Sequence, residues 1–171
     1  MKMGAAAAGL LVLASCAQFD QEVALCPNAA VLEAPGELVR FKEGTAAGPE
    51  NVLYRTKMKY VSGVCDFDEK SIDMELSVAM EAKRGAANAD GKAQFTFFIA
   101  VIDADRKILM REEFPLIAVF EKDDDDINFS ESLTLSIPRK EGFAPTDYSV
   151  YLGFEMTPEE LAYNRRRQKR R

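Results

Sequence analysis

Histidine and tryptophan are both absent from the 171 residues of this chain. Without histidine, Ser-His-Asp and Cys-His catalytic arrangements and histidine-based zinc sites are excluded. Acidic residues are abundant, so a pair of catalytic carboxylates stays possible in principle, but no spacing singles one out. We therefore expect a protein that is not an enzyme, with no catalytic residue, no metal ligand and no cofactor.

The acidic run Asp123–Asp126 is the segment that most suggests a metal site. Calcium loops alternate their oxygen ligands along the chain, and four adjacent aspartates cannot all converge on one ion. This run therefore predicts a solvated turn between strands, with calcium binding as the weaker alternative.

A long hydrophobic run is also lacking. The apolar stretch 4–13 follows Lys2 and is about ten residues long, whereas a helix needs about 20 to span a bilayer. Such a stretch is typical of a signal peptide. Leu13-Ala14-Ser15-Cys16 follows it and resembles the lipobox of bacterial lipoproteins. The resemblance implies cleavage after residue 15 and acylation of Cys16, which anchors the protein to a membrane; an ordinary cleaved signal is the alternative.

The residue after Cys16 bears on the destination. Ala17 stands where aspartate favours retention in the inner membrane of enteric bacteria. The sequence therefore favours the cell envelope, with a lipid anchor in the outer membrane and the domain facing the periplasm.

We expect residues 16–28 to form a lipidated tether, 29–156 the folded domain and 157–171 a C-terminal helix with a basic tail.

Cysteine is scarce, with three residues in all. With Cys16 assigned to lipid, Cys26 and Cys65 remain as an even pair in an oxidising compartment. We expect them to form a disulfide; two unrelated buried thiols are the alternative.

Alternating apolar residues dominate the middle of the chain. The clearest case is 71–80, where Ile72, Met74, Leu76, Val78 and Met80 share one face. Similar short runs occur at 52–61, 93–102, 107–114, 116–120, 132–137 and 147–155, separated by turn residues. In the first of these, Met58 and Tyr60 share one face and Ser62-Gly63 breaks the pattern. Pro115 either bends the chain or lies on an edge strand. This pattern predicts an all-β fold: a two-sheet antiparallel sandwich, immunoglobulin-like, with a short C-terminal helix.

The chain ends in helix signals and then cations. Thr157-Pro158-Glu159-Glu160 combines an N-cap, a proline in the first turn and a glutamate three residues after the cap. The basic residues that follow could contact an anionic surface, fold back onto the domain, or simply be solvated. They are Arg165, Arg166, Arg167, Lys169, Arg170 and Arg171. Without them the mature chain carries a net charge of −13. We expect no nucleic-acid partner, because the tail lacks interleaved aromatic residues.

Several short stretches together resemble a group of small uncharacterised lipoproteins of Gram-negative envelopes. These stretches are Cys26-Pro27, Ser62-Gly-Val-Cys65, Phe97-Phe-Ile-Ala-Val101, Ser136-Ile-Pro138, Tyr151-Leu-Gly-Phe154 and Thr157–Arg165. The resemblance covers most of the mature chain and supports the class and the location. It implies no activity and assigns no functional residue.

Two functions follow as expectations. The first is a non-catalytic envelope lipoprotein that presents its sandwich to a protein, the cell wall or anionic lipid. The second is a periplasm-facing carrier that binds a small or amphipathic ligand between its sheets. The first is favoured because the inward-facing residues are large (Phe, Met and Leu), which predicts a filled core.

Overall fold

The computed structural model describes residues 25–122 and 124–169. Eight strands, two short 3-10 turns and one helix follow one another along these residues. The elements are β1 (Asn28–Val31), β2 (Glu37–Phe41), η1 (Pro49–Asn51), β3 (Val52–Phe67), β4 (Ser71–Arg84), β5 (Lys92–Ile102), β6 (Ile108–Val119), β7 (Asp126–Pro138), η2 (Pro145–Asp147), β8 (Ser149–Phe154) and α1 (Pro158–Gln168).

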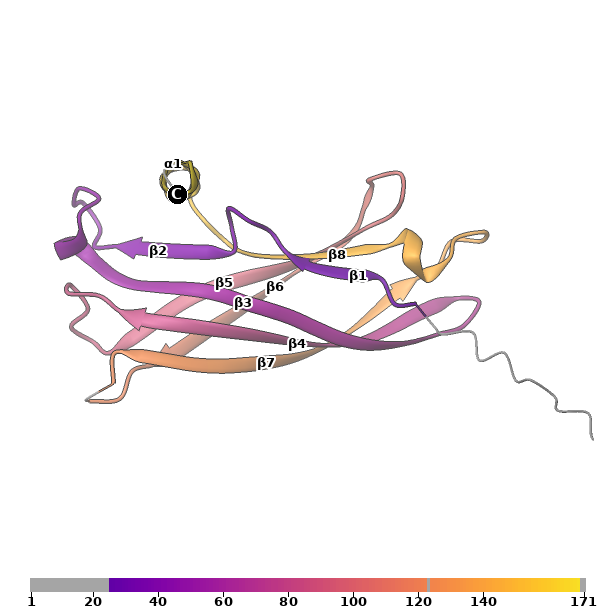
Figure 1. The fold of residues 1–171 in the computed structure, drawn as a ribbon, viewed down its shortest axis with the longest axis horizontal. Coiled ribbons are helices and arrows are strands. Elements are labelled where there is room, and N and C mark those ends of the chain that lie inside the picture. The colour runs from indigo at the N-terminus through magenta and orange to yellow at the C-terminus, as the bar shows by residue number, and fades with distance from the viewer. Residues whose placement is uncertain (1–24, 123, 170–171) are drawn as a thin grey trace, which may run out of the picture.

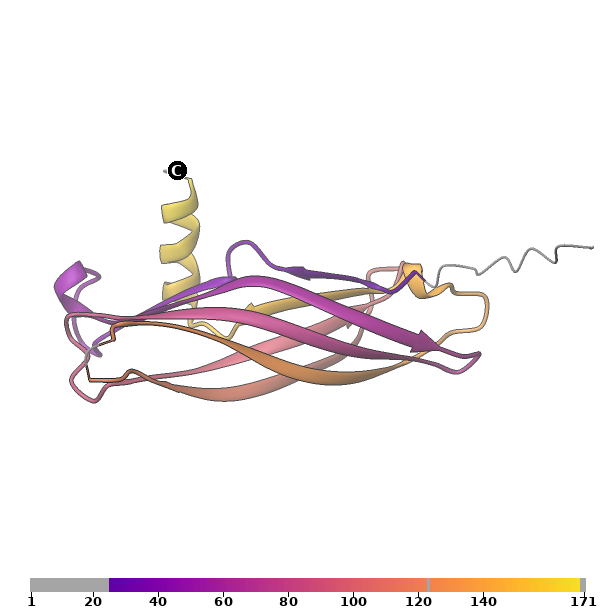
Figure 2. The same cartoon turned by 60° about the horizontal axis from the view of Figure 1, so that its bottom comes forward.

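The strands form two four-stranded sheets, which confirms the two-sheet sandwich. One sheet has the order β1-β8-β5-β6 and the other the order β2-β3-β4-β7. Every pairing is antiparallel except that of β1, which runs parallel to β8. The long strands make an elongated body, and α1 lies across it near one end (Figures 1 and 2).

The core lies between the sheets and follows the alternation of the sequence. Ile72, Met74, Leu76, Val78 and Met80 of β4 are all buried, as predicted. They face Phe95, Phe97, Ile99 and Val101 of β5 and Val150, Leu152 and Phe154 of β8 within one core cluster. Large apolar side chains therefore fill the space between the sheets.

Three strands differ from the sequence pattern. β3 does not end at Ser62-Gly63, as we expected, but continues to Phe67. A register shift between Met58 and Tyr60 reverses the facing of the residues that follow, so Tyr60 is 61 % exposed instead of sharing the buried face of Met58. β6 joins two expected runs into one strand and carries Pro115 on a sheet edge, which is one of the two outcomes expected there, and β7 begins at Asp126, well before Ser132.

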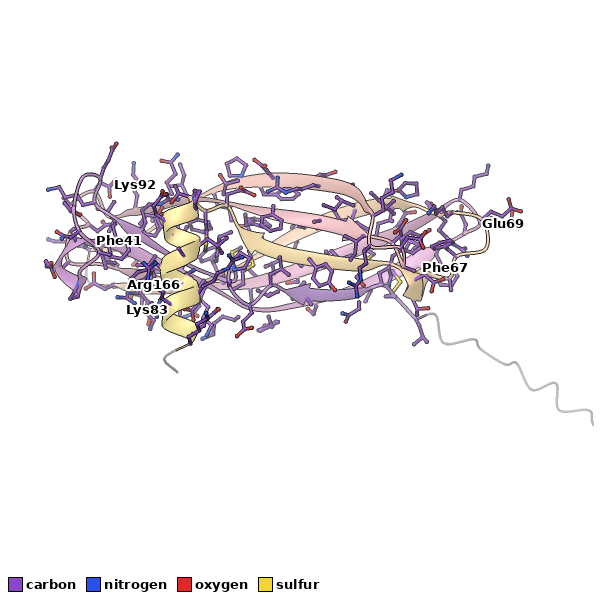
Figure 3. The ribbon with its side chains drawn as sticks, turned by 90° about the horizontal axis from the view of Figure 1, so that it is seen from above. Phe41, Phe67, Glu69, Lys83, Lys92 and Arg166 are labelled. Carbon is purple, nitrogen blue, oxygen red and sulfur yellow. A yellow bond between two sulfur atoms is a disulfide. The ribbon has the colours of Figure 1, made fainter. Side chains whose placement is uncertain are left out.

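The two ends of the body carry different loops. The tight turn between β3 and β4, marked by Phe67 and Glu69 in Figure 3, lies at the end opposite Phe41, Lys92 and α1. The described chain begins at the β3–β4 end, where Cys26 bonds to Cys65. The chain that precedes residue 25 is therefore joined to the domain at the end away from α1.

Candidate interaction surfaces

The disulfide between Cys26 and Cys65 is confirmed. Their Cα atoms are 5.7 Å apart, a usual separation for a disulfide. Cys26 precedes β1 in one sheet and Cys65 lies near the end of β3 in the other, so the bond joins the two sheets. Cys16 and the expected signal peptide lie outside the described residues. Among those that are described, no helix is long and apolar enough to cross a bilayer.

Helix α1 is docked on its own domain through polar contacts. Its capping box forms as the sequence predicts, with the Glu160 amide donating to the Thr157 hydroxyl and the Thr157 amide to the Glu160 carboxylate. The same carboxylate pairs with Arg40 at 2.9 Å. The buried Asn164 amide donates to the carbonyls of Ala34, at 3.1 Å, and Glu37. These bonds hold the helix against the edge of β2.

The docking separates the basic residues into two groups. Arg167 forms an ion pair with Glu37 at 3.5 Å and lies over the Tyr163 ring. By contrast, Arg165, Arg166 and Lys169 are exposed, and Arg170 and Arg171 lie outside the described residues. Among the described tail residues, Arg167 and Gln168, which donates to the Glu33 carbonyl at 2.8 Å, contact the domain, and three further cations face solvent.

Lysines of the neighbouring sheet surface have carboxylate partners. Lys59 and Lys83 both contact Glu81, and Lys83 also pairs with Asp126 at 2.5 Å. The hydrogen bond from Lys59 lowers the pKa of Glu81, and the hydrogen bond to Asp126 raises the pKa of Lys83. These charges are compensated locally, so the exposed helix cations are the better candidates for an external anionic partner.

The outer face of the β2-β3-β4-β7 sheet carries a hollow of about 490 Å³. Three serines, Ser62, Ser77 and Ser132, lie side by side across β3, β4 and β7. The next row holds Val64, Glu75 and Thr134, and Val64 is 66 % exposed. Tyr60 lies one row away on the other side, opposite Ala79. Tyr60 thus lies beside the six outward-facing side chains of these two rows, which we call the hydroxyl-lined hollow: Ser62, Val64, Glu75, Ser77, Ser132 and Thr134.

Exposed aromatic, aliphatic and hydroxyl groups on a rigid sheet suit recognition better than catalysis. The hollow offers hydroxyls that donate and accept and one carboxylate, and the exposed Tyr60 ring beside it can stack on a partner. The sequence did not reveal this site, because its residues come from three strands and meet only through the register. The single signal was Tyr60, which the alternation pattern placed on the wrong face.

A second recess, of about 620 Å³, opens where β8 ends and leaves part of β5 without a neighbour. Side chains bond the carbonyls left open there: Tyr54 donates to the Gln94 carbonyl and Asn88 to that of Lys92. Burial raises the pKa of Tyr54. Arg40, Asp90 and Glu155 line this recess together with Leu53, Phe95 and Pro115, so its wall is part polar and part apolar. It lies at one end of the sandwich, whereas a carrier would hold its ligand between the sheets.

The described residues of the acidic run, Asp124 to Asp126, are exposed and lie between β6 and β7 or at the start of β7. Asp125 lies 3.7 Å from Arg84 and Asp126 pairs with Lys83. Across residues 25–122 and 124–169, no group of three or more potential ligating side chains could hold a metal ion.

No family model and no curated protein matches this sequence. Among solved structures, the chain is similar to the variable (V) domain of the AgI/II polypeptide BspA of Streptococcus agalactiae, at 11 % identity and a TM-score of 0.18, covering 71 % of this chain and 73 % of that one. A likeness of that degree transfers nothing about function.

Proposed function

We propose that this chain is a non-catalytic cell-envelope lipoprotein that presents its sandwich to a protein or cell-wall partner. The observation that supports this best is the hydroxyl-lined hollow, an exposed recess on the outside of a well-filled sandwich. The filled core gives no support to a carrier with a ligand between its sheets. The hydroxyls, the carboxylate and the exposed Tyr60 ring suit a polar partner such as a glycan or a peptide.

The proposed anchor has a simple consequence. Replacing Cys16 by serine removes the only atom that can receive the thioether-linked lipid, so we expect the protein to stay unprocessed or to become soluble. Fractionation of intact cells, with the mass of the mature N-terminus, measures both. A Cys16→Ser protein that remains membrane-bound in the same processed form would disprove lipidation at this residue.

Two experiments test the hollow. One measures binding of the protein to purified cell-wall sacculi, and the other uses photo-crosslinking in intact cells, with a photoreactive residue in place of Ser77. Tyr60→Ala removes the stacking ring, and we expect a loss of about 1–3 kcal/mol in binding energy, or roughly five- to a hundredfold in affinity.

Ile117→Ala is the matched control for this test. Ile117 is 58 % exposed, close to the 61 % of Tyr60, but it lies on β6 of the other sheet. We expect it to leave binding unchanged. Equal losses for both variants, or none for Tyr60→Ala together with no crosslink from Ser77, would remove the hollow as the binding surface.

A further inference from the structure

The two sheets have four edge strands, and three of them are protected against pairing with another strand. β1 is only four residues long. The edge of β2 is covered by α1, whose Asn164 bonds the Glu37 carbonyl. On β6, Pro115 lies opposite Thr96, whose carbonyl accepts a hydrogen bond from Glu155 on the β8 side. The polar groups of that pair therefore point away from each other, and Pro115 leaves the open edge of β6 without a donor at its middle.

The fourth edge strand, β7, lacks these protections. It spans thirteen residues with no lysine and no proline before Pro138. The Asp125 carbonyl accepts a hydrogen bond from the Arg84 backbone amide, and the Arg139 backbone amide donates to the Lys70 carbonyl. The backbone groups of odd-numbered residues of β7 therefore bond to β4. Even-numbered residues therefore direct their backbone groups to the open edge. Their side chains are exposed and mostly small: Asp126, Asn128, Ser130, Ser132, Thr134 and Ser136.

We propose that β7 pairs antiparallel with β7 of a second copy of this chain, with the two-fold axis at Ser132. Ser132 is the central residue of Asp126–Pro138, so this register pairs the whole strand. It places Asp126 opposite Pro138. The backbone N–H that proline lacks is therefore missing only at the two ends of the paired strands. A register centred on Glu131 is disfavoured, because it would place two glutamates directly opposite each other.

The side chains also match in this register. On the outer face Ser130 meets Thr134, and Asn128 meets Ser136, which are favourable cross-strand polar pairs. On the inner face Phe129 meets Leu135 and Ile127 meets Ile137, whereas the half-buried Glu131 meets Leu133. A groove of about 470 Å³, which Ile127 and Phe129 line together with β6 residues and Glu131, lies on this side of the sandwich, so the second copy would cover its rim.

Charges beyond the two strand ends complement each other. The acidic turn precedes β7, whereas Arg139 and Lys140 follow it directly. The two-fold axis brings Asp124 and Asp125 of one copy beside Lys140 and Arg139 of the other. Lys140 already pairs with Asp103 and Asp105, yet its side chain remains 47 % exposed. Opposite charges therefore meet at both ends of the paired strands, which fixes the register and the direction.

Cysteine crosslinking in intact cells tests the register with the full chain. Across a hydrogen-bonded antiparallel pair the two Ser132 Cα atoms would lie about 5.5 Å apart, within the range of a disulfide. We expect Ser132→Cys to give a disulfide-linked dimer on a non-reducing gel. Thr134→Cys is the control: its two copies would lie about 13 Å apart, too far to bond.

The affinity is measured by sedimentation of the purified protein. Ser132→Pro removes a donor that serves only the open edge, so the monomer keeps its own hydrogen bonds while the dimer loses two; we expect dimerisation to weaken about thirtyfold. Glu113→Pro changes the open edge of β6 in the same way, at a residue that does not line the groove of Ile127 and Phe129, and should leave the dimer intact. A monomer at every concentration, equal crosslinking at positions 132 and 134, or equal dimerisation of the wild-type protein and Ser132→Pro would overturn the proposal.

Discussion

Replacing Cys26 and Cys65 together by serine is expected to lower the free energy of unfolding by about 3–4 kcal/mol. The bond links residues separated by 39 positions, and closing a loop of that size restricts the unfolded chain by about this amount. It also joins the segment before β1 to the end of β3, so its loss frees the start of the domain at the end where the chain enters. For a domain of this length the melting temperature should fall by roughly 6–16 °C.

Urea unfolding of the wild-type protein and the double variant measures this change. Both cysteines are replaced together so that neither is left as an unpaired thiol that could form another disulfide. Cys16→Ser is the control, because the sequence predicts that this residue belongs to the tether, so we expect the unfolding energy to stay unchanged. A loss below about 1 kcal/mol would show that strand packing alone holds the two sheets together at this end.

The sequence predicted the parts of this fold that depend on local patterns. The alternation in 71–80 and the capping box at Thr157 both concern neighbours along the chain, and both formed as expected. The disulfide followed from an even number of cysteines in a presumed oxidising compartment, with no knowledge of the fold.

The remaining features depend on contacts between distant residues. The shift at Met58–Tyr60 exposes Tyr60, and no local pattern in β3 marks it. β1 was not foreseen as a strand, because it is four residues long and acquires its partner only from β8, far along the chain. The docking of α1 through Asn164 spans 130 residues to the Ala34 carbonyl.

The candidate sites also differ in whether local sequence or long-range contacts determine them. The basic residues were visible as a run of sequence, but only the structure separates Arg167, paired with Glu37, from the exposed Arg165, Arg166 and Lys169. The hydroxyl-lined hollow and the open edge of β7 exist only through strand register, so composition and spacing could not reveal them.

The exposed cations of α1 are expected to bind anionic lipid, and their removal should have a large effect. Each cation close to an anionic membrane surface contributes about 1 kcal/mol. Replacing Arg165, Arg166 and Lys169 by glutamine should therefore weaken binding to vesicles containing phosphatidylglycerol by about a hundredfold. The binding should also weaken between low and physiological salt, since exposed charges are screened beyond about 8 Å at physiological ionic strength.

Arg167→Gln provides the control, because Arg167 lies in the same helix but contacts Glu37 and the Tyr163 ring. We expect it to lower the melting temperature slightly and to change vesicle binding far less than the triple variant. The triple variant, Arg167→Gln and the protein with the wild-type tail all carry Cys16→Ser, so that no acyl chain contributes to the measured affinity. If the triple variant binds vesicles as the wild-type tail does, the tail does not contact the membrane. A lower melting temperature for Arg167→Gln would then assign the tail to its own domain, where it holds α1 against the edge of β2.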